Sequence, residues 1–170
     1  MTVAPTRAVL VIGAPGAGKT TLWERLCNAL TDDDVRHAAF EAEALALSHP
    51  ALLSDRAFAH IRALAASFRE AGFGLLIATA TVESQWWCEG VCDALGVGSV
   101  LVVRCDARPE TLERRLRERE PADWSGLERL IRASGPLAAT AAKLDVDLAI
   151  DTEATGLDDA VALVREAAAI

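Results

Sequence analysis

A glycine-rich segment near the start of the chain lies between an apolar run and an amphipathic stretch. Residues 13–20 read GAPGAGKT, follow AVLVI at 8–12 and precede TTLWERLCNAL at 20–30. The segment fits G-x-x-x-x-G-K-[ST] between a strand and a helix, the context in which this pattern forms a phosphate-binding loop. Glycines allow several backbone N–H groups and the positive end of the next helix to converge on an anion. The segment predicts a nucleotide site; the alternative is a glycine-rich turn that binds no nucleotide.

The loop also predicts which side chains act on the phosphates. Lys19 is expected to bridge the β- and γ-phosphates, and so to be catalytic, while the Thr20 hydroxyl is expected to coordinate Mg²⁺. We therefore predict ATP and Mg²⁺ as cofactors. The predicted nucleotide contacts in this segment are Gly13, Ala14, Pro15, Gly16, Ala17, Gly18, Lys19, Thr20 and Thr21.

Two carboxylates, Glu41 and Glu43, follow the strand-like stretch VRHAAF at 35–40. Parallel sheets bind ligands at the carboxyl ends of their strands, and phosphoryl transfer to a hydroxyl needs a carboxylate to orient the acceptor and take its proton. We expect Glu41 to be this catalytic base and Glu43 to contact the substrate or hold the metal's water shell, but the residues leave open which of the two is the base. An exposed helix start with favourable charge is the alternative.

An arginine-rich helix, PETLERRLRERE, is predicted over residues 109–120. Arg115 and Arg119 lie four residues apart and share one helix face. Planar guanidinium groups stabilise transferring charge and stack on bases. Both arginines are expected to bind nucleotide, and Arg119 is expected to be catalytic. Because glutamates are interleaved with them, a solvated helix with internal salt bridges is the alternative.

Apolar runs alternate with helical patterns along the rest of the chain. The runs that predict strands are 8–12, 35–40, 73–80, 99–105 and 146–151. Helices are predicted over 20–30, 54–72, 82–95, 109–120, 125–144 and 156–169, with Ser54 as a cap, Gly72 as a stop and a break at Gly135-Pro136. This alternation predicts an α/β fold of three layers, with a doubly wound, five-stranded parallel sheet. We expect residues 1–170 to form a single domain.

Composition excludes several classes of partner. The chain has 25 acidic and 17 basic residues and a net charge of -8, so it lacks the basic footprint of a protein that binds nucleic acid or anionic membranes. No apolar run approaches the roughly 20 residues of a membrane span, and we expect a cytoplasmic protein. The four cysteines have no metal-ligand spacing and are expected to be free thiols. A small-molecule partner, and a monomer or homodimer, are expected.

Other nucleotide-binding classes fit less well. A guanine-specific switch usually carries N-K-x-D, but the only asparagine is Asn28 in the first predicted helix. A motor ATPase needs an apolar strand that ends in Asp-Glu, whereas the third predicted strand leads into Thr79-Ala80-Thr81. A kinase and a nucleotide-binding regulator with little or no hydrolysis therefore remain.

The acceptor pocket is predicted over the ends of the second and third strands, bounded by residues 44–62 and 79–87. Trp86 and Trp87 either stack on a flat substrate or pack in the core, and at most one is expected to stack because adjacent helical residues point about 100° apart. Trp124 either closes on the nucleotide or packs against the next helix. The candidate acceptor contacts are Glu41, Glu43, Arg56, Thr79 and Thr81.

Taken together, the loop at 13–20, the carboxylates at 41–43, the R-L-x-x-R spacing at 115–119 and Ile150-Asp151-Thr152 resemble the P-loop kinases of small metabolites. Shikimate, gluconate and adenylylsulfate kinases and chloramphenicol phosphotransferase belong to this group. The resemblance implies a nucleotide-kinase-like P-loop NTPase fold, an acidic residue after the second strand that activates the acceptor, and a short lid around 115–125. It also implies a loop that touches adenine, formed by Asp151, Thr152, Glu153 and Ala154.

The resemblance has limits that order the possible functions. Adenylate kinases continue their loop with Gly-Thr where this chain has Thr20-Thr21, and their Asp-Gly-Phe-Pro-Arg acceptor segment is missing. The sequence therefore predicts an ATP-dependent phosphotransferase that acts on a small molecule, at a hydroxyl group. A nucleoside monophosphate kinase and a non-catalytic nucleotide-binding regulator are the alternatives.

Overall fold

A five-stranded parallel sheet forms the centre of the computed structural model, which describes residues 6–170. Residues 1–5 of the predicted domain lie outside the described residues. The sheet order is β2-β3-β1-β4-β5, and every pairing is parallel. The predicted doubly wound α/β fold is confirmed. The strands are β1 (Arg7–Gly13), β2 (Ala38–Glu41), β3 (Leu75–Ala80), β4 (Ser99–Asp106) and β5 (Leu148–Asp151).

The central strands β1 and β3 read as continuous apolar runs because helices cover both of their faces. Every residue from Ala8 to Gly13 and from Leu75 to Ala80 is buried. The edge strands β2 and β5 are shorter than the apolar runs that predict them. His37, expected within the second strand, lies just before it. Its ring nitrogen Nδ1 is hydrogen-bonded to the carbonyl of Val35 at 2.8 Å.

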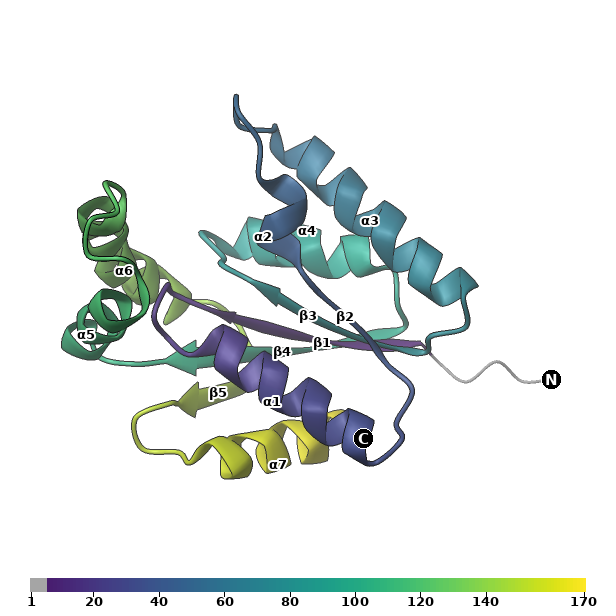
Figure 1. The fold of residues 1–170 in the computed structure, drawn as a ribbon. Coiled ribbons are helices and arrows are strands. Elements are labelled where there is room, and N and C mark those ends of the chain that lie inside the picture. Colours follow the sequence, from purple (N-terminus) through teal and green to yellow (C-terminus); the bar gives the residue numbers. More distant parts are fainter. Residues whose placement is uncertain (1–5) are drawn as a thin grey trace.

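Helices pack on both faces of the sheet (Figure 1). Leucines of α1 (Lys19–Asp32) and valines of α7 (Leu157–Ala168) share one apolar core with alternate residues of β1 and β3. On the opposite face, α3 (Ser54–Glu70) and α4 (Gln85–Leu95) enclose a second core. The remaining helices are α2 (Ala42–Ala46), α5 (Pro109–Arg119) and α6 (Leu127–Ala141).

Three details of the helices test the expected boundaries. Leu53 is the N-cap of α3 and Ser54 is its first helical residue, so the predicted cap is wrong by one position. Gly72 does end α3: it has a φ of 85°, and its N–H donates to the carbonyl of Arg69 at 2.9 Å. The predicted break at Gly135-Pro136 is wrong, because α6 continues through Pro136. The proline is exposed, and it lacks the N–H that would donate to the carbonyl of Arg132 in a regular helix.

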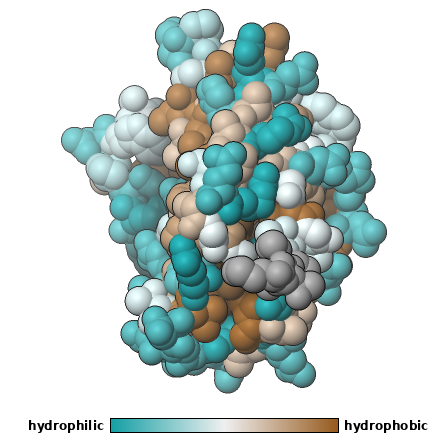
Figure 2. All heavy atoms as spheres, turned by 90° about the vertical axis from the view of Figure 1, so that its right-hand side faces the viewer, coloured by the Kyte–Doolittle hydropathy of each residue, from teal (hydrophilic) through white to brown (hydrophobic). Residues whose placement is uncertain are grey.

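The side of the molecule at which the strands begin carries no continuous apolar surface in the part drawn in colour. Hydrophilic side chains cover most of this face in Figure 2, and apolar ones lie between them as separate patches. The opposite edge, where the strands end, carries the residues that the sequence analysis selected.

Candidate nucleotide and acceptor site

The glycine-rich loop connects β1 to α1 through backbone conformations that only glycine adopts readily. Gly16 and Gly18 have φ values of 84° and 95°. A Cβ on Gly16 would lie 2.8 Å from the carbonyl oxygen of Leu112, which belongs to α5. A Cβ on Gly13 would lie 2.6 Å from the carbonyl oxygen of Cys105. The loop is therefore closely packed against β4 and α5, and α1 begins directly after it, at Lys19.

Lys19 carries a charge that is almost enclosed by protein, with 9% of the residue exposed. Its Nζ donates to the carbonyl of Ala14 at 3.1 Å. Within residues 6–170, the structure shows no carboxylate at salt-bridge distance from this ammonium group. Burial lowers the pKa of Lys19, and the charge of Glu43 is the strongest influence that opposes this shift. A buried ammonium group beside a helix N-terminus fits the phosphates of a nucleotide.

A cavity of about 390 Å³ lies against this loop. Its lining combines an ammonium group, guanidinium groups and hydroxyls with apolar side chains, a combination that suits a nucleotide. The loop and the start of α1 contribute Gly16, Gly18, Lys19, Thr20, Thr21 and Leu22. The other walls are Arg115, Arg119, Thr152, Thr155, Leu157 and Ala160.

The two arginines of α5 both line this cavity but are held differently. Arg115 donates through Nη1 to the carbonyl of Gly16 at 3.3 Å and to Thr152 Oγ1 at 2.9 Å, and through Nη2 to the carbonyl of Thr152 at 3.1 Å. Arg119 is exposed and donates from Nε to Glu120 Oε1 at 2.7 Å. Arg115 therefore joins α5 to the loop and to the end of β5, whereas Arg119 has only its sequence neighbour as an ionic partner within the described residues.

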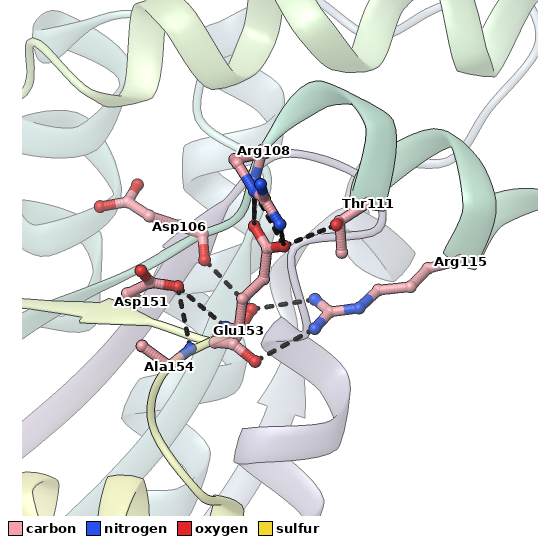
Figure 3. Close-up of polar contacts among 8 residues, drawn as sticks. Asp106, Arg108, Thr111, Arg115, Asp151, Glu153 and Ala154 are labelled. Atoms are coloured by element: carbon pink, nitrogen blue, oxygen red, sulfur yellow. Dashed lines mark hydrogen bonds and ion pairs between the residues drawn. The ribbon is translucent and has the colours of Figure 1, made fainter.

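Only Thr152 of the predicted adenine loop lines the cavity; Asp151, Glu153 and Ala154 lie apart from it. The Glu153 carboxylate accepts from the backbone N–H of Arg108 at 2.7 Å and from Thr111 Oγ1 at 2.7 Å (Figure 3). Hydrogen bonds from Arg108 are the main cause that lowers the pKa of Glu153 to about 2. Asp151 Oδ1 accepts from the N–H groups of Glu153 and Ala154, so Asp151 shapes the loop.

Four residues that sequence reasoning missed line the cavity: Leu22, Thr155, Leu157 and Ala160. Leu22 lies in α1 directly after the predicted contacts, Thr155 follows the predicted adenine loop, and Leu157 and Ala160 lie in the first turn of α7. One signal could have identified Leu157: it is an apolar residue in the first turn of a helix that begins at the ligand-binding edge of the sheet. Such a residue belongs to no sequence motif.

The two acidic residues at the end of β2 and the start of α2 face different parts of the site. Glu41 Oε1 accepts from the hydroxyl of Thr20 at a long 3.5 Å. Glu43, on α2, accepts from the backbone N–H of Thr81 and lines a second cavity. Glu41 therefore lies beside Thr20, the predicted metal ligand, and Glu43 lines the predicted acceptor pocket. The sequence leaves open which of the two is the base.

The second cavity, of about 440 Å³, lies where the acceptor pocket was predicted. On one side it is lined by α2 and the segment that follows, with Ala42, Glu43, Ala46, Leu47 and Ser54. The other side is formed by the end of β3 and the start of α4, with Ala80, Thr81, Glu83, Ser84, Trp86 and Trp87.

Three of the predicted acceptor contacts, Glu41, Arg56 and Thr79, do not line this cavity. Arg56 is exposed on α3. Thr79 is 1% exposed and pairs in register with Glu41 on the neighbouring strand. Its hydroxyl is buried without a hydrogen-bond partner among the described residues.

The adjacent tryptophans line the second cavity together. The Phe58 ring lies 5.5 Å from Trp86 and 4.6 Å from Trp87, measured between ring centroids. Trp87 is half-buried against the core, whereas Trp86 is 58% exposed. Trp124 does not line the nucleotide cavity; its ring packs over Gly126, where a Cβ would lie 2.3 Å from it.

Four further observations concern the cysteines, possible metal ligands, membrane-spanning helices and the predicted lid. The cysteines at 27, 88, 92 and 105 are free thiols, as predicted. In residues 6–170, no group of three or more histidine, cysteine, aspartate or glutamate side chains is placed to hold a metal ion. No helix in the same range is both long and apolar enough to cross a membrane. Residues 120–126 join α5 to α6 by turns, at the place of the predicted lid.

Residues 9–132 match the sequence profile of a family described as an AAA domain. The chain belongs to this family. A search of curated proteins found no match to this AAA domain protein.

Solved structures share the fold of this AAA domain protein over nearly its whole length. A sugar kinase from a Janibacter species has 20% sequence identity and a TM-score of 0.66, with 95% of this chain and 94% of that chain covered. A gluconokinase from Sinorhizobium meliloti has 18% identity and a TM-score of 0.64, with 97% and 90% covered. The APS kinase of Mycobacterium tuberculosis, solved with AMPPNP and APS, has 16% identity and a TM-score of 0.65, with 96% and 97% covered. The predicted resemblance to small-molecule P-loop kinases is confirmed in fold.

Proposed function

We propose that this AAA domain protein is an ATP-dependent phosphotransferase that moves the γ-phosphate to a hydroxyl of a small molecule. One observation carries the proposal: Glu43 lines the second cavity and also exerts the strongest opposing influence on the pKa of Lys19, in the first cavity. A carboxylate that lines one cavity and lies close enough to influence a charged group in the other is suited to a reaction between their two occupants. The kinases of similar fold support the same reaction class.

Different residues of the first cavity bind different parts of ATP. The N–H groups of the loop and Lys19 hold the phosphates, and Arg119 stabilises charge on the transferring group. Leu157 and Ala160 provide apolar surface for the base. The Thr20 hydroxyl, with Glu41 beside it, fits the oxygen ligands that Mg²⁺ prefers. When bound, Mg²⁺ neutralises phosphate charge.

On the acceptor side, we assign the base to Glu43. Its carboxylate orients the acceptor hydroxyl and takes its proton, while the hydroxyl oxygen bonds to the γ-phosphorus. The bond from that phosphorus to the β–γ bridging oxygen breaks, and ADP leaves. The proton on Glu43 is then released to solvent. Lys19 remains on the phosphates throughout.

The alternative of a nucleoside monophosphate kinase has less support. Such an enzyme must hold an acceptor phosphate, for which arginine is the usual partner. The second cavity is lined by no lysine, arginine or histidine of the described residues.

Acceptor-dependent ADP formation tests the proposal and separates it from a nucleotide-binding regulator. A panel of hydroxyl compounds is incubated with enzyme and Mg·ATP, and ADP is measured in a single turnover. We expect at least one compound to accelerate ADP formation. Glu43→Gln should slow that transfer by about 10²-fold or more with ATP affinity retained. Glu89→Gln, on an exposed part of α4, is the matched control. The proposal would be contradicted if no compound accelerated ADP formation, or if Glu43→Gln transferred phosphate at the normal rate.

A further inference from the structure

The second cavity combines negative charge with aromatic surface. Glu43 and Glu83 supply two carboxylates to its lining, and no described lysine, arginine or histidine does. The basic residues of the adjoining segments, His49, Arg56, His60 and Arg62, do not line the cavity. His60 on α3 is hydrogen-bonded through Nδ1 to the carbonyl of Leu45 at 2.8 Å. Among the residues that line this cavity, an anion would meet two carboxylates and no basic side chain, whereas a cation would meet two opposite charges.

The tryptophans give this negative cavity a defined surface for a ring. Phe58 packs against both indoles, so Trp86 is supported from the core while more than half of it remains exposed. An exposed indole face binds flat apolar groups and also attracts cations through its ring quadrupole. Ala46, Leu47 and Ala80 extend the apolar surface on either side of the carboxylates.

We propose that the acceptor is a hydroxyl compound that carries a protonated amine and a flat ring, and that compounds with a carboxylate or phosphate are rejected. This inference rests on the proposed function, because it assigns the second cavity to the acceptor. Trp86 and Trp87 hold the ring, and Glu83 pairs with the amine. Glu43 accepts from the Thr81 N–H through Oε1 and offers its other oxygen to the hydroxyl.

Three benzyl alcohols that differ in charge test the inference. The probes are para-(aminomethyl)benzyl alcohol, benzyl alcohol and para-(hydroxymethyl)benzoate, which share the ring and the hydroxymethyl group. Their affinities for the full chain are measured by calorimetry at neutral pH without ATP, so that no turnover is needed. We expect the amine to bind about tenfold more tightly than the carboxylate, with the neutral alcohol between them.

Variants of Glu83 make the charge argument specific. Glu83→Gln should reduce the preference for the amine, and Glu83→Lys should reverse it in favour of the carboxylate. Trp86→Ala should weaken binding of the amine and of the neutral alcohol, because both use the ring surface. Glu89→Gln removes a carboxylate from α4 outside the cavity and should leave all three affinities unchanged.

The outcomes separate this inference from the proposed function. Equal affinities, tighter binding of the carboxylate, or no measurable binding of the amine would overturn the inference, even if another compound accelerates ADP formation. A charge preference that follows Glu83 supports the inference as a statement about binding. If no hydroxyl compound then accelerates ADP formation, it is the proposed transfer reaction that fails.

Discussion

The ammonium group of Lys19 links the acid–base state of the protein to nucleotide binding. Burial lowers the pKa of Lys19 in the free protein, and bound phosphates favour its charged form. The pKa therefore rises on binding. Between the lower and the higher pKa, the free protein has lost a proton that the complex retains, so binding must take up a proton.

We predict that ATP affinity falls as the pH rises through the lowered pKa of Lys19, and that binding at pH values between the pKa of the free protein and that of the complex is accompanied by proton uptake. Calorimetry in two buffers with different heats of ionisation measures the uptake. Lys19→Met should bind ATP weakly and lose the uptake, whereas Lys143→Met, at an exposed lysine, should keep both. Proton release, or the same uptake in Lys19→Met, would contradict the assignment.

Glu41 provides a second prediction for a single residue. Because its carboxylate lies beside the Thr20 hydroxyl, we expect Glu41→Gln to raise the Mg²⁺ concentration needed for half-maximal ATP binding. Glu43→Gln, which changes the carboxylate on the acceptor side, should not. Titration of ATP binding with Mg²⁺ in the two variants shows which of the two carboxylates supports Mg²⁺ binding. If Glu43→Gln alone shifts the Mg²⁺ requirement, the metal role belongs to Glu43 and not to Glu41.

The different placement of these two carboxylates shows what the sequence can and cannot predict. Strand periodicity and the loop motif predict that Glu41 and Glu43 lie at the carboxyl edge of the sheet, and both do. Glu41 is the last residue of β2 and keeps the strand's alternation, whereas Glu43 follows the turn into α2. The AEALA segment of α2 is too short to show a helical period. The direction of each side chain therefore depends on a turn that no pattern in the sequence reports.

At the scale of elements, α5 contributes two arginines to the nucleotide cavity. Arg115 joins the helix to the glycine-rich loop, whereas Arg119 makes no hydrogen bond to that loop within the described residues. Arg115 makes three hydrogen bonds to the loop and the β5 end, while Arg119 has an ionic contact with Glu120. The R-L-x-x-R spacing predicts that both arginines lie on one face. It does not distinguish the one that supports the structure from the one that is free to move onto a ligand.

We predict that Arg115→Ala and Arg119→Ala have different effects. Arg115→Ala should lower the free energy of unfolding by about 1–3 kcal/mol, the usual cost when hydrogen bonds to a charged group are lost. Arg119→Ala should change it by less than about 0.5 kcal/mol, since its ion pair is exposed, while slowing turnover more than it weakens ADP binding. Urea unfolding, ADP calorimetry and single-turnover rates measure the three quantities. Equal stability of the two variants would refute this division.

At the scale of the whole molecule, the network around Glu153 connects the start of α5 to the end of the last strand. Glu153 accepts hydrogen bonds from Arg108 and Thr111, and these hold the pKa of its carboxyl near 2, below its ordinary value. A carboxyl whose pKa is lower in the folded state stabilises the fold above its ordinary pKa. This contribution is lost as the pH falls from there toward about 2.

We therefore predict that Glu153→Gln weakens the pH dependence of folding stability in this acidic window. Urea midpoints measured across the window should fall less steeply with decreasing pH in this variant than in the natural chain. Glu110→Gln, at an exposed residue of α5, should retain the steeper dependence. An unchanged slope in Glu153→Gln would show that other carboxyl groups dominate.

Thr152 gives the last strand a role that its edge position conceals. Its hydroxyl lies 3.0 Å from the carbonyl oxygen of Ala17 and 3.1 Å from that of Asp106, and it accepts from Arg115. Strand β5 pairs with β4 alone, and such edges open locally more often than central strands. A nucleotide that touches Thr152 would suppress this opening. Amide hydrogen exchange should therefore slow in β5 and α7 when ATP is added, more than in the opposite edge strand β2, so that the end of the chain reports whether the loop near its beginning is occupied.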